Sequence, residues 1–405
     1  MSPKRVLFFG TYDVEQGYPR ARSLMQSLES QGVEVFGLRE DLLPTKGKRM
    51  RLLRSPWLWP GQALKIMSGG VRLRSQLRAL LREERIDAII VPYPGYLAVK
   101  WAHDVFDGPV FLDMFLSLSD TVISDRRLFR AGGRIDHALQ AIDRRACDYA
   151  DGVFLDTPEH QSFVIEETGA DPDKFFFVPI GDPLAPGHPF PFPALETGQP
   201  LRAVYLGTGV PLHGIETLLS GVARTEGMHL TFIGGTPEHR HAARALGSHR
   251  VTVIEDWLGS DRIHGLLAAH HVVFGLFGTS DKAGRVVPYK LVHALAAGRA
   301  GVTAETSSIR TLLDPGSDCY TCQAGDSVGL ARVLTGIVEN PQLASVVAKR
   351  ARRSYERMFS PEAIGSRLLM GMELITGDSG WSVPKSEGTS ESSGSESIDR
   401  ELVSS

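Results

Sequence analysis

The chain has few cysteines, no long apolar run and little net charge. Three cysteines in 405 residues are too few for a disulfide framework and suit a reducing compartment. No segment approaches the roughly 20 apolar residues that a membrane-spanning helix needs. A formal net charge of −3 gives no general reason to expect nucleic acid as a partner. These shortages argue against a disulfide-stabilised domain, a membrane-spanning protein and a nucleic-acid binder.

The signals for a metal site and for export are equally sparse. Cys319 and Cys322 form one CxxC pair, without a second pair or a nearby histidine to complete four zinc ligands. The apolar run near the N-terminus, Val6–Phe9, has the length of a strand and is too short for a signal peptide. We therefore expect no metal, no cofactor and a cytoplasmic location.

What the chain does have is enough length for two cores, because single cores rarely grow beyond about 250–300 residues. Its first half alternates apolar β-runs with helical patterns, which predicts a parallel sheet covered by helices. The expected strands are Val6–Phe9, Val33–Phe36, Ala88–Val91, Val110–Leu112, Gly152–Leu155 and Phe175–Val178. The expected helices between the later strands are Leu97–Phe106, Ile135–Ala150 and Glu159–Thr168.

A proline-rich stretch divides this pattern from a second one of the same kind. The later strands are expected at Ala203–Gly207, Leu230–Gly234, Val251–Ile254, Val272–Leu276 and Ala300–Thr303. The predicted organisation is a first domain over 1–183, a linker over 184–200, a second domain over 201–360, a helix over 361–375 that packs back on the first domain, and a disordered Ser-rich acidic tail over 376–405. The fold class is α/β, with two doubly wound Rossmann-like domains facing across a cleft.

The stretch Gly284–Gly301, GRVVPYKLVHALAAGRAG, is the most specific motif. Pro288 suits the first turn of a helix of about ten residues, and Gly298 suits its end. The positive end of such a helix is a ready site for a diphosphate. Lys290 and His293 lie one turn apart and can point into the cleft. With Lys282 and Arg285 in the preceding loop, Lys290 could neutralise a pyrophosphate leaving group; the alternative is a solvated basic loop capping a buried helix.

This stretch resembles the donor-site segment of glycosyltransferase family 4, group 1, whose usual form is P-x-K followed by E-A-L-A-x-G. In that family two glutamates mark the site, and the second usually holds the nucleotide ribose. Arg285 and His293 occupy those two places here. The resemblance implies that Pro288, Tyr289 and His293 contact the donor, with a packed structural role as the alternative for His293.

A second segment of resemblance is VYLGTGVPLHGIETLL, Val204–Leu219, which is similar to the first strand, glycine loop and helix of the family's donor domain. Its glycines permit close backbone approach to a ligand. The places of the family's phosphate-binding arginine and lysine carry Thr208 and His213. The donor-binding candidates here are therefore Gly207, Thr208, His213 and Gly214.

The first domain contains the candidates for acceptor binding. The run Phe8–Leu28 resembles a strand, glycine loop and helix, and it offers Gly10, Tyr12 and Arg20, the last for a charged acceptor. The run Phe111–Arg127 resembles a strand-end loop of the same subgroup, and it offers Asp113 and Asp120. Such carboxylates suit sugar hydroxyls, and one could stabilise an oxocarbenium-like centre. A purely structural loop is the alternative.

Residues 45–85 form a basic stretch that also contains Trp57 and Trp59. Anionic lipid headgroups attract each nearby lysine or arginine by about 1 kcal/mol. We expect this stretch to contact the inner face of a membrane and so to bring the enzyme to a lipid-linked acceptor; an ordinary basic helix with buried tryptophans is the alternative.

The resemblance covers about residues 1–375 and implies the GT-B fold and a glycosyltransferase of the hexosyltransferase type, acting with retention. It would move a sugar from a nucleoside diphosphate to a glycan or lipid-linked acceptor in cell-surface polysaccharide or glycoconjugate synthesis. Lys290, Arg285 and Asp113 are the candidate catalytic residues. No metal is needed, because a helix dipole and basic side chains can stabilise the leaving diphosphate. A non-catalytic sugar-nucleotide-binding partner and a nucleotide-sugar hydrolase or epimerase remain alternatives.

Overall fold

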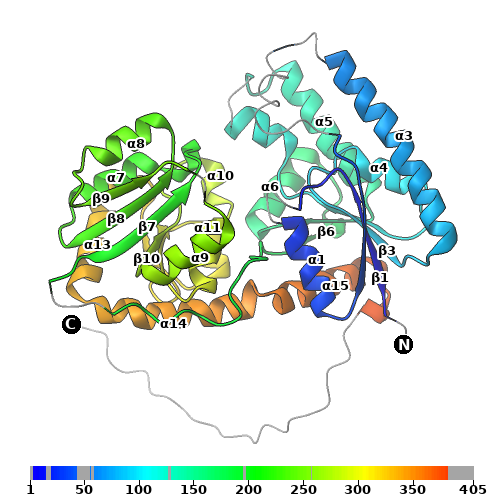
Figure 1. Ribbon diagram of the computed structural model, residues 1–405. Coiled ribbons are helices and arrows are strands. Elements are labelled where there is room, and N and C mark those ends of the chain that lie inside the picture. The colour runs from blue at the N-terminus through cyan, green and yellow to red at the C-terminus, as the bar shows by residue number, and fades with distance from the viewer. Residues whose placement is uncertain are drawn as a thin grey trace, which may run out of the picture.

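The computed structural model describes residues 3–14, 20–42, 55, 59–125, 129–194, 198–256 and 258–381. Most of the basic stretch before Trp59 and the acidic tail after Trp381 lie outside these residues. The described chain forms two lobes, each built on a parallel sheet of six strands with helices around it (Figure 1). The predicted fold class, two Rossmann-like domains of the α/β type, is confirmed.

The first sheet has the strand order β2-β1-β3-β4-β5-β6. Its strands are β1 (Arg5–Gly10), β2 (Glu34–Arg39), β3 (Ala88–Val91), β4 (Val110–Asp113), β5 (Gly152–Leu155) and β6 (Phe175–Phe177). Its helices are α1 (Arg20–Ser30), α3 (Trp59–Glu83), α4 (Ala98–His103), α5 (Arg134–Tyr149) and α6 (Pro158–Thr168). The central strands are buried on both faces, which is why the sequence shows them as continuous apolar runs.

The second sheet has the order β12-β11-β10-β7-β8-β9. Its strands are β7 (Leu201–Gly207), β8 (Met228–Gly234), β9 (Val251–Ile254), β10 (Val272–Phe274), β11 (Ala300–Ala304) and β12 (Tyr320–Cys322). Its helices are α7 (Ile215–Ala223), α8 (Pro237–Arg244), α9 (Ser260–Ala269), α10 (Asp281–Gly284), α11 (Tyr289–Ala296), α12 (Ser307–Leu312), α13 (Ser327–Glu339) and α14 (Pro341–Met358). Each sheet places the carboxyl ends of its parallel strands on one edge, where ligands of such folds bind.

Local sequence signals set several helix ends. Thr157 and Thr236 cap α6 and α8 by accepting a backbone N–H through their side chains, and a proline follows each cap directly. Gly169 ends α6 in the left-handed conformation, with φ of +61°, which glycine adopts without strain. These ends position α6, which lies between the two lobes and packs against α12.

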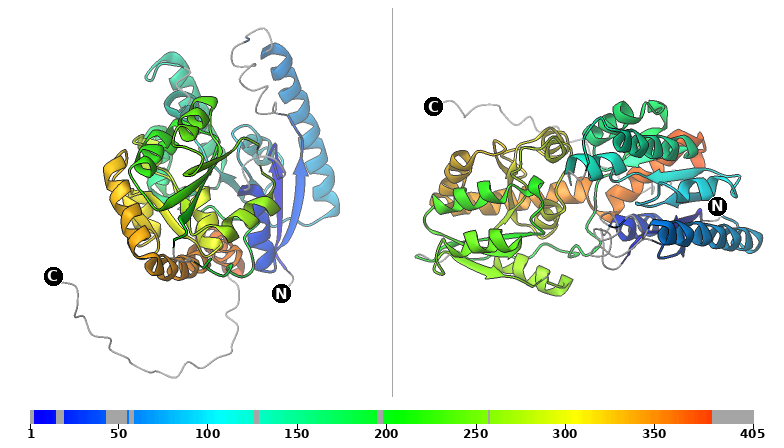
Figure 2. Two further views of the ribbon diagram at one scale, coloured as in Figure 1. Left: turned by 60° about the vertical axis from the view of Figure 1, so that its left-hand side comes forward. Right: turned by 90° about the horizontal axis from the view of Figure 1, so that it is seen from above.

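The end of the described chain joins the two lobes. Helix α14 packs against α11, and α15 (Pro361–Thr376) then packs against α1 in the first lobe (Figure 2). Ile364, Leu368 and Met372 are buried in the core beneath the first sheet. Gly365 allows the close contact, because a Cβ atom there would collide with the backbone oxygen of Ser27.

Two arginines, Arg299 and the partly buried Arg352, hold the proline-rich connection against the second lobe. Arg299 is fully buried and donates hydrogen bonds to backbone carbonyls on both sides of the contact, those of Phe190, Pro191 and Leu267. Arg352 does the same for the carbonyls of Pro186, Gly187 and Ala296. Prolines cannot donate backbone hydrogen bonds, so guanidinium donors to their carbonyls fix a segment that has no regular structure.

Candidate functional site

The helix predicted from the main motif is present as α11, and its first turn carries a buried cation. Pro288 is the residue before the helix, with φ of −68° and ψ of 133°, and the helix is eight residues long. Lys290 is 7% exposed, and its Nζ atom lies 4.3 Å from the centre of the Tyr205 ring. No hydrogen-bond acceptor contacts Nζ within the described chain. Burial lowers the pKa of Lys290 to about 7, because the charged form of the amine loses its contact with water.

The glycine loop after β7 lies beside this lysine. Nδ1 of His213 and the hydroxyl of Tyr205 are 2.7 Å apart. The pKa of His213 is lowered to about 2, mainly by burial and to a smaller extent by the charge of Lys290. The imidazole is therefore neutral. Gly207 leaves room for this pair, because a Cβ atom there would collide with the Tyr205 hydroxyl and the His213 ring. Thr208 is exposed at the tip of the loop.

Gly214 fixes the other end of the loop. Its φ is +59°, and a Cβ atom there would collide with the backbone of Phe277 and Gly278 at the end of β10. The loop therefore packs directly against the segment that leads to α10 and α11.

Lys282 and Arg285 lie at the boundary between the lobes and bind an acid of the first lobe. Nζ of Lys282 and Nη2 of Arg285 are 3.3 and 3.1 Å from the carboxylate oxygens of Asp120. The guanidinium of Arg285 also lies 3.7 Å from the centre of the Phe163 ring. The hydroxyl of Thr157 donates to the backbone carbonyl of Arg285 at 2.5 Å. The predicted donor-site cations thus meet the predicted acceptor-side aspartate.

Tyr289 and His293 contact the end of the first domain. Nδ1 of His293 lies 2.5 Å from one carboxylate oxygen of Asp182, and the Tyr289 hydroxyl donates to the other at 2.9 Å. Burial acts to raise the pKa of Asp182, but the hydrogen bond and charge of His293 outweigh burial and hold this pKa below its usual value. The two residues therefore anchor the start of the connection to α11.

Arg20 and Asp113 form a buried ion pair within the first lobe. The two side chains are 2% and 1% exposed, and Nε of Arg20 lies 2.7 Å from Oδ1 of Asp113. Arg20 also donates to the carbonyls of Val178 and Pro179. Burial raises the pKa of Asp113, although the charge of Arg20 opposes the shift. Arg20, the candidate for a charged acceptor, thus binds Asp113, the candidate catalytic carboxylate.

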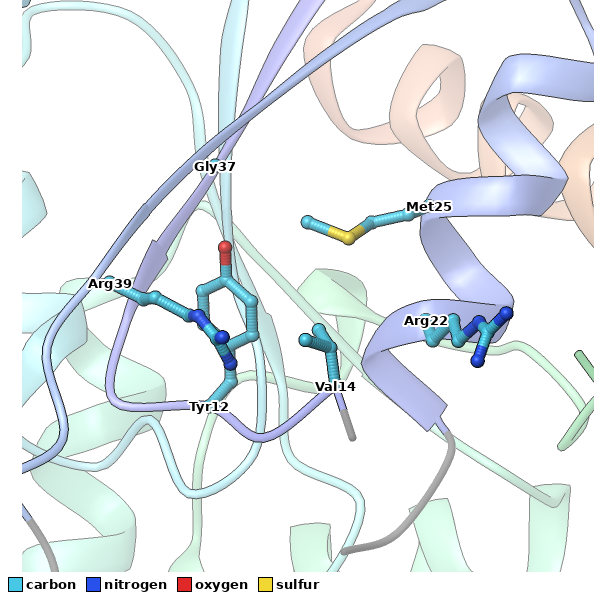
Figure 3. A pocket seen from close by; sticks show the side chains of 6 residues that line it. All are labelled: Tyr12, Val14, Arg22, Met25, Gly37 and Arg39. Carbon is cyan, nitrogen blue, oxygen red and sulfur yellow. The ribbon is translucent and has the colours of Figure 1, made fainter. Parts of the chain in front are cut away.

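Gly10 and Tyr12 lie at the end of β1, and Tyr12 lines an open cavity of about 460 Å³ (Figure 3). Arg22 from α1 and Arg39 from β2 also line it, and the sequence reasoning singled out neither arginine. The Tyr12 hydroxyl donates to the Phe8 carbonyl at 3.2 Å, and burial raises the pKa of Tyr12 to about 12. Gly10 has φ of +132°, and a Cβ atom there would lie 3.0 Å from that of Ala98.

Several buried polar atoms of this region have no hydrogen-bond partner. A buried polar atom without a partner costs about 1–3 kcal/mol, so such atoms mark places where a ligand or water can bind. In the described part of the chain they include Arg20 Nη2, Asp113 Oδ2, His160 Nε2, Arg285 Nε and Lys290 Nζ. They come from the end of β4 and the first turns of α1 and α6 in the first lobe, and from the α10–α11 segment of the second. Across all the residues that the structure describes, no group of three or more His, Cys, Asp or Glu side chains is placed to hold a metal ion.

Asp156, Thr157, His160, Phe163 and Asp182 belong to this region and were not predicted from the sequence. Asp156, Thr157 and His160 lie together in the run 150–161, and nothing in that run indicates a contact with Arg285. Asp182 lies 111 positions from His293, and no local pattern links them.

Two family models match the chain. A glycosyl transferase 4-like domain matches residues 17–181, and a glycosyl transferase-like domain matches residues 214–369. Among curated proteins, a search by sequence finds no match.

Solved structures share the architecture at low identity. A sucrose-phosphate synthase from Thermosynechococcus elongatus has a TM-score of 0.65 and 16% identity, covering 91% of this chain and 98% of its own. HepE of Anabaena, solved with UDP-glucose, has a TM-score of 0.63 and 14% identity, covering 91% and 99%. A glycosyltransferase from Rickettsia africae has a TM-score of 0.60 and 12% identity, covering 93% and 100%. Residues 17–181 therefore form a glycosyl transferase 4-like domain and residues 214–369 a glycosyl transferase-like domain, arranged in the GT-B fold.

Proposed function

We propose that this protein is a glycosyltransferase that moves a hexose-like sugar from a nucleoside diphosphate to a glycan or lipid-linked acceptor. The main support is Lys290, a buried lysine in the first turn of α11 whose Nζ atom has no hydrogen-bond acceptor in the described part of the chain. The positive end of that helix and the neighbouring glycine loop suit a diphosphate. The structures of HepE with UDP and UDP-glucose are consistent with a nucleotide-sugar ligand.

The chemistry follows from where charge develops. As the bond between the sugar and the diphosphate breaks, negative charge grows on the leaving phosphate oxygen, and Lys290 and the α11 dipole would stabilise it without a metal. Arg285 and Lys282 would add positive charge once the diphosphate competes with Asp120 for them. The resemblance to family 4 favours retention of the anomeric configuration and a role in cell-surface polysaccharide or glycoconjugate synthesis.

The pairing of Lys282 and Arg285 with Asp120 also favours a second candidate, a sugar-nucleotide-binding partner without activity. A nucleotide-sugar hydrolase of the same fold is a third. Donor turnover separates them: a transferase needs an acceptor for full turnover, a hydrolase does not, and an inactive partner binds the donor without consuming it.

A thermal-shift panel of nucleoside diphosphates, each paired with its sugar conjugates, tests the proposal. A ligand present at about 100 times its Kd stabilises the folded protein by roughly 2.7 kcal/mol, which a melting curve detects. We expect one base to stand out in both its diphosphate and its sugar forms. A panel in which no nucleotide raises the melting temperature at millimolar concentration would refute the donor site.

Helix α3 supports a lipid-linked acceptor. Leu64, Met67 and Val71 lie on one face of this helix and are 67%, 68% and 58% exposed. The opposite face is buried through Leu73 and Leu77. The same helix carries the basic residues Lys65, Arg72, Arg74, Arg78 and Arg82. An exposed apolar face flanked by cations, at the outer edge of the first lobe (Figure 1), suits an anionic lipid surface. None of the described helices is long and apolar enough to cross a bilayer.

Replacing Leu64, Met67 and Val71 together by serine is expected to weaken binding to phosphatidylglycerol vesicles by about tenfold or more, because three apolar side chains lose their contact with lipid. Vesicle co-sedimentation of the full chain measures this. The matched control replaces Val328, Leu343 and Val346, which are 50%, 57% and 45% exposed on the second lobe. Equal loss in both triple variants, or no loss in the first, would contradict the α3 surface.

A further inference from the structure

A histidine and an aspartate form a buried pair that the reaction described above does not use. Asp156 directly follows β5, and His160 lies in the first turn of α6. Nδ1 of His160 lies 2.8 Å from Oδ1 of Asp156, and the side chains are 1% and 4% exposed. The carboxyl end of a parallel strand and the helix that follows it are where such folds bind ligands.

The hydrogen bond determines what the other ring nitrogen can do. When the imidazole is neutral, its one ring proton lies on the nitrogen that faces the carboxylate, so Nδ1 of His160 donates to Asp156. Nε2 is then a hydrogen-bond acceptor. This atom is buried and has no partner, and an O–H group of a ligand would satisfy it.

The pair lies against the second lobe, next to the loop that carries Arg285. Thr157 donates its hydroxyl to the backbone carbonyl of Arg285. The Phe163 ring lies 6.4 Å from the His160 ring, centre to centre, and 3.7 Å from the Arg285 guanidinium. Glu159, the residue before His160, accepts a hydrogen bond from the Ser308 hydroxyl at 3.0 Å. Four consecutive residues, 157–160, therefore lie at the boundary between the lobes.

We propose that Nε2 of His160 accepts a hydrogen bond from a hydroxyl group of the sugar being transferred, and that Asp156 positions the ring. This inference rests on the proposed function. A diphosphate held by Lys290 and Arg285 would leave its sugar facing the first lobe. The segment that carries Asp156 and His160 contacts Arg285 through Thr157 and Phe163, and it offers a buried acceptor without a partner. His160 is then a binding residue for the sugar, and Asp156 is a positioning residue.

The experiment compares the affinity for the nucleoside diphosphate with the affinity for its sugar conjugate. The variant is His160→Asn, because the amide of asparagine can still donate to Asp156 but has nothing in place of Nε2. The second variant is Asp156→Asn, which removes the carboxylate that fixes the tautomer. The control is His137→Asn on α5, where the histidine is exposed. Calorimetry gives both Kd values, using the diphosphate and sugar conjugate that stabilise the wild type most.

In His160→Asn we expect the Kd of the sugar conjugate to rise about tenfold, the change expected for the loss of one hydrogen bond. The Kd of the bare diphosphate should stay within about twofold of the wild-type value. Asp156→Asn should show the same selective loss to a smaller degree, and His137→Asn should show none. Equal weakening of both ligands would mean that His160 acts only on structure, and unchanged binding of both would also overturn the inference. If the wild type binds no nucleotide, the proposed function itself fails.

Discussion

Replacing Lys290 by methionine is expected to weaken nucleoside diphosphate binding by about 100-fold and to abolish measurable transfer, while making the unliganded protein more stable. Binding weakens because the ammonium ion is the buried cation at the positive end of α11. Stability rises because a buried amine without a hydrogen-bond acceptor is replaced by an apolar chain of similar length. Calorimetry with the diphosphate and urea unfolding without ligand measure the two effects.

The gain in stability should depend on pH with a defined sign. Burial lowers the pKa of Lys290 from 10.5 to about 7, so the unfolded chain binds more protons than the folded chain between these two values. The cost of burying Lys290 is therefore complete below pH 7 and disappears above pH 10.5. The difference in unfolding free energy between Lys290→Met and wild type should shrink by about 1.4 kcal/mol for each pH unit between those limits.

Lys349 supplies the matched control, because it is exposed on α14. Lys349→Met should leave nucleotide affinity and the pH dependence of stability unchanged. A Lys290→Met protein that keeps wild-type affinity would refute the donor site, and one that is less stable than wild type at pH 7 would refute the account of its burial.

The fold was predictable from the sequence because the strands of a buried parallel sheet are continuous apolar runs. Val6–Phe9 and Ala88–Val91 lie within β1 and β3. Strand β12 was missed because it has three residues, two of them only half buried, which leaves no periodic signal. Helix α3 was recognised as a basic region but not delimited, because its exposed Leu64 and Met67 disturb the usual alternation of apolar and polar faces.

Candidate-site residues that follow a local motif could be predicted from the sequence, whereas the contacts that these residues make with distant parts of the chain could not. Lys290 and Gly207 carry a signal in their own neighbours, a proline before a helix and a glycine after a strand. Asp120 lies 165 positions from Arg285, and contacts over such separations depend on the packing of the two lobes. For this reason the sequence indicated Asp120 as an acceptor-binding residue and Arg285 as a catalytic residue at the donor site, and gave no sign that they bind each other.

The two places where the family resemblance implies glutamates have a common arrangement. Each carries a basic residue, Arg285 or His293, and each of these binds an aspartate from the other part of the chain, Asp120 or Asp182. A carboxylate thus lies beside each of the two positions. Asp120 belongs to the first lobe, and Asp182 lies at the end of that lobe, just before the proline-rich connection. Replacement of either basic residue would remove one partner of a buried aspartate, which keeps Lys282 or Tyr289, so both positions are coupled to the packing of the lobes.

The buried pair of Arg20 and Asp113 is expected to show the second large effect. Asp113→Leu leaves the guanidinium buried without its counter-charge, and Arg20→Met leaves the carboxylate, so each single variant should lose about 3–5 kcal/mol of stability. The double variant should recover most of that loss, because two apolar side chains then replace two desolvated charges. Urea unfolding of the four proteins gives the coupling energy.

The double variant also separates the structural role of the pair from its role in binding. Arg20 Nη2 and Asp113 Oδ2 are buried without partners although the two side chains bind each other, so the pair has a donor and an acceptor left for a ligand. If a substrate binds these two atoms, the double variant Arg20→Met, Asp113→Leu should fold with near wild-type stability and keep its affinity for the diphosphate. Its rate of sugar transfer should fall by about 100-fold or more. Transfer at the wild-type rate in that protein would show that the pair only stabilises the first lobe. Two single variants that are as stable as wild type would show that the charges are not buried as the structure describes.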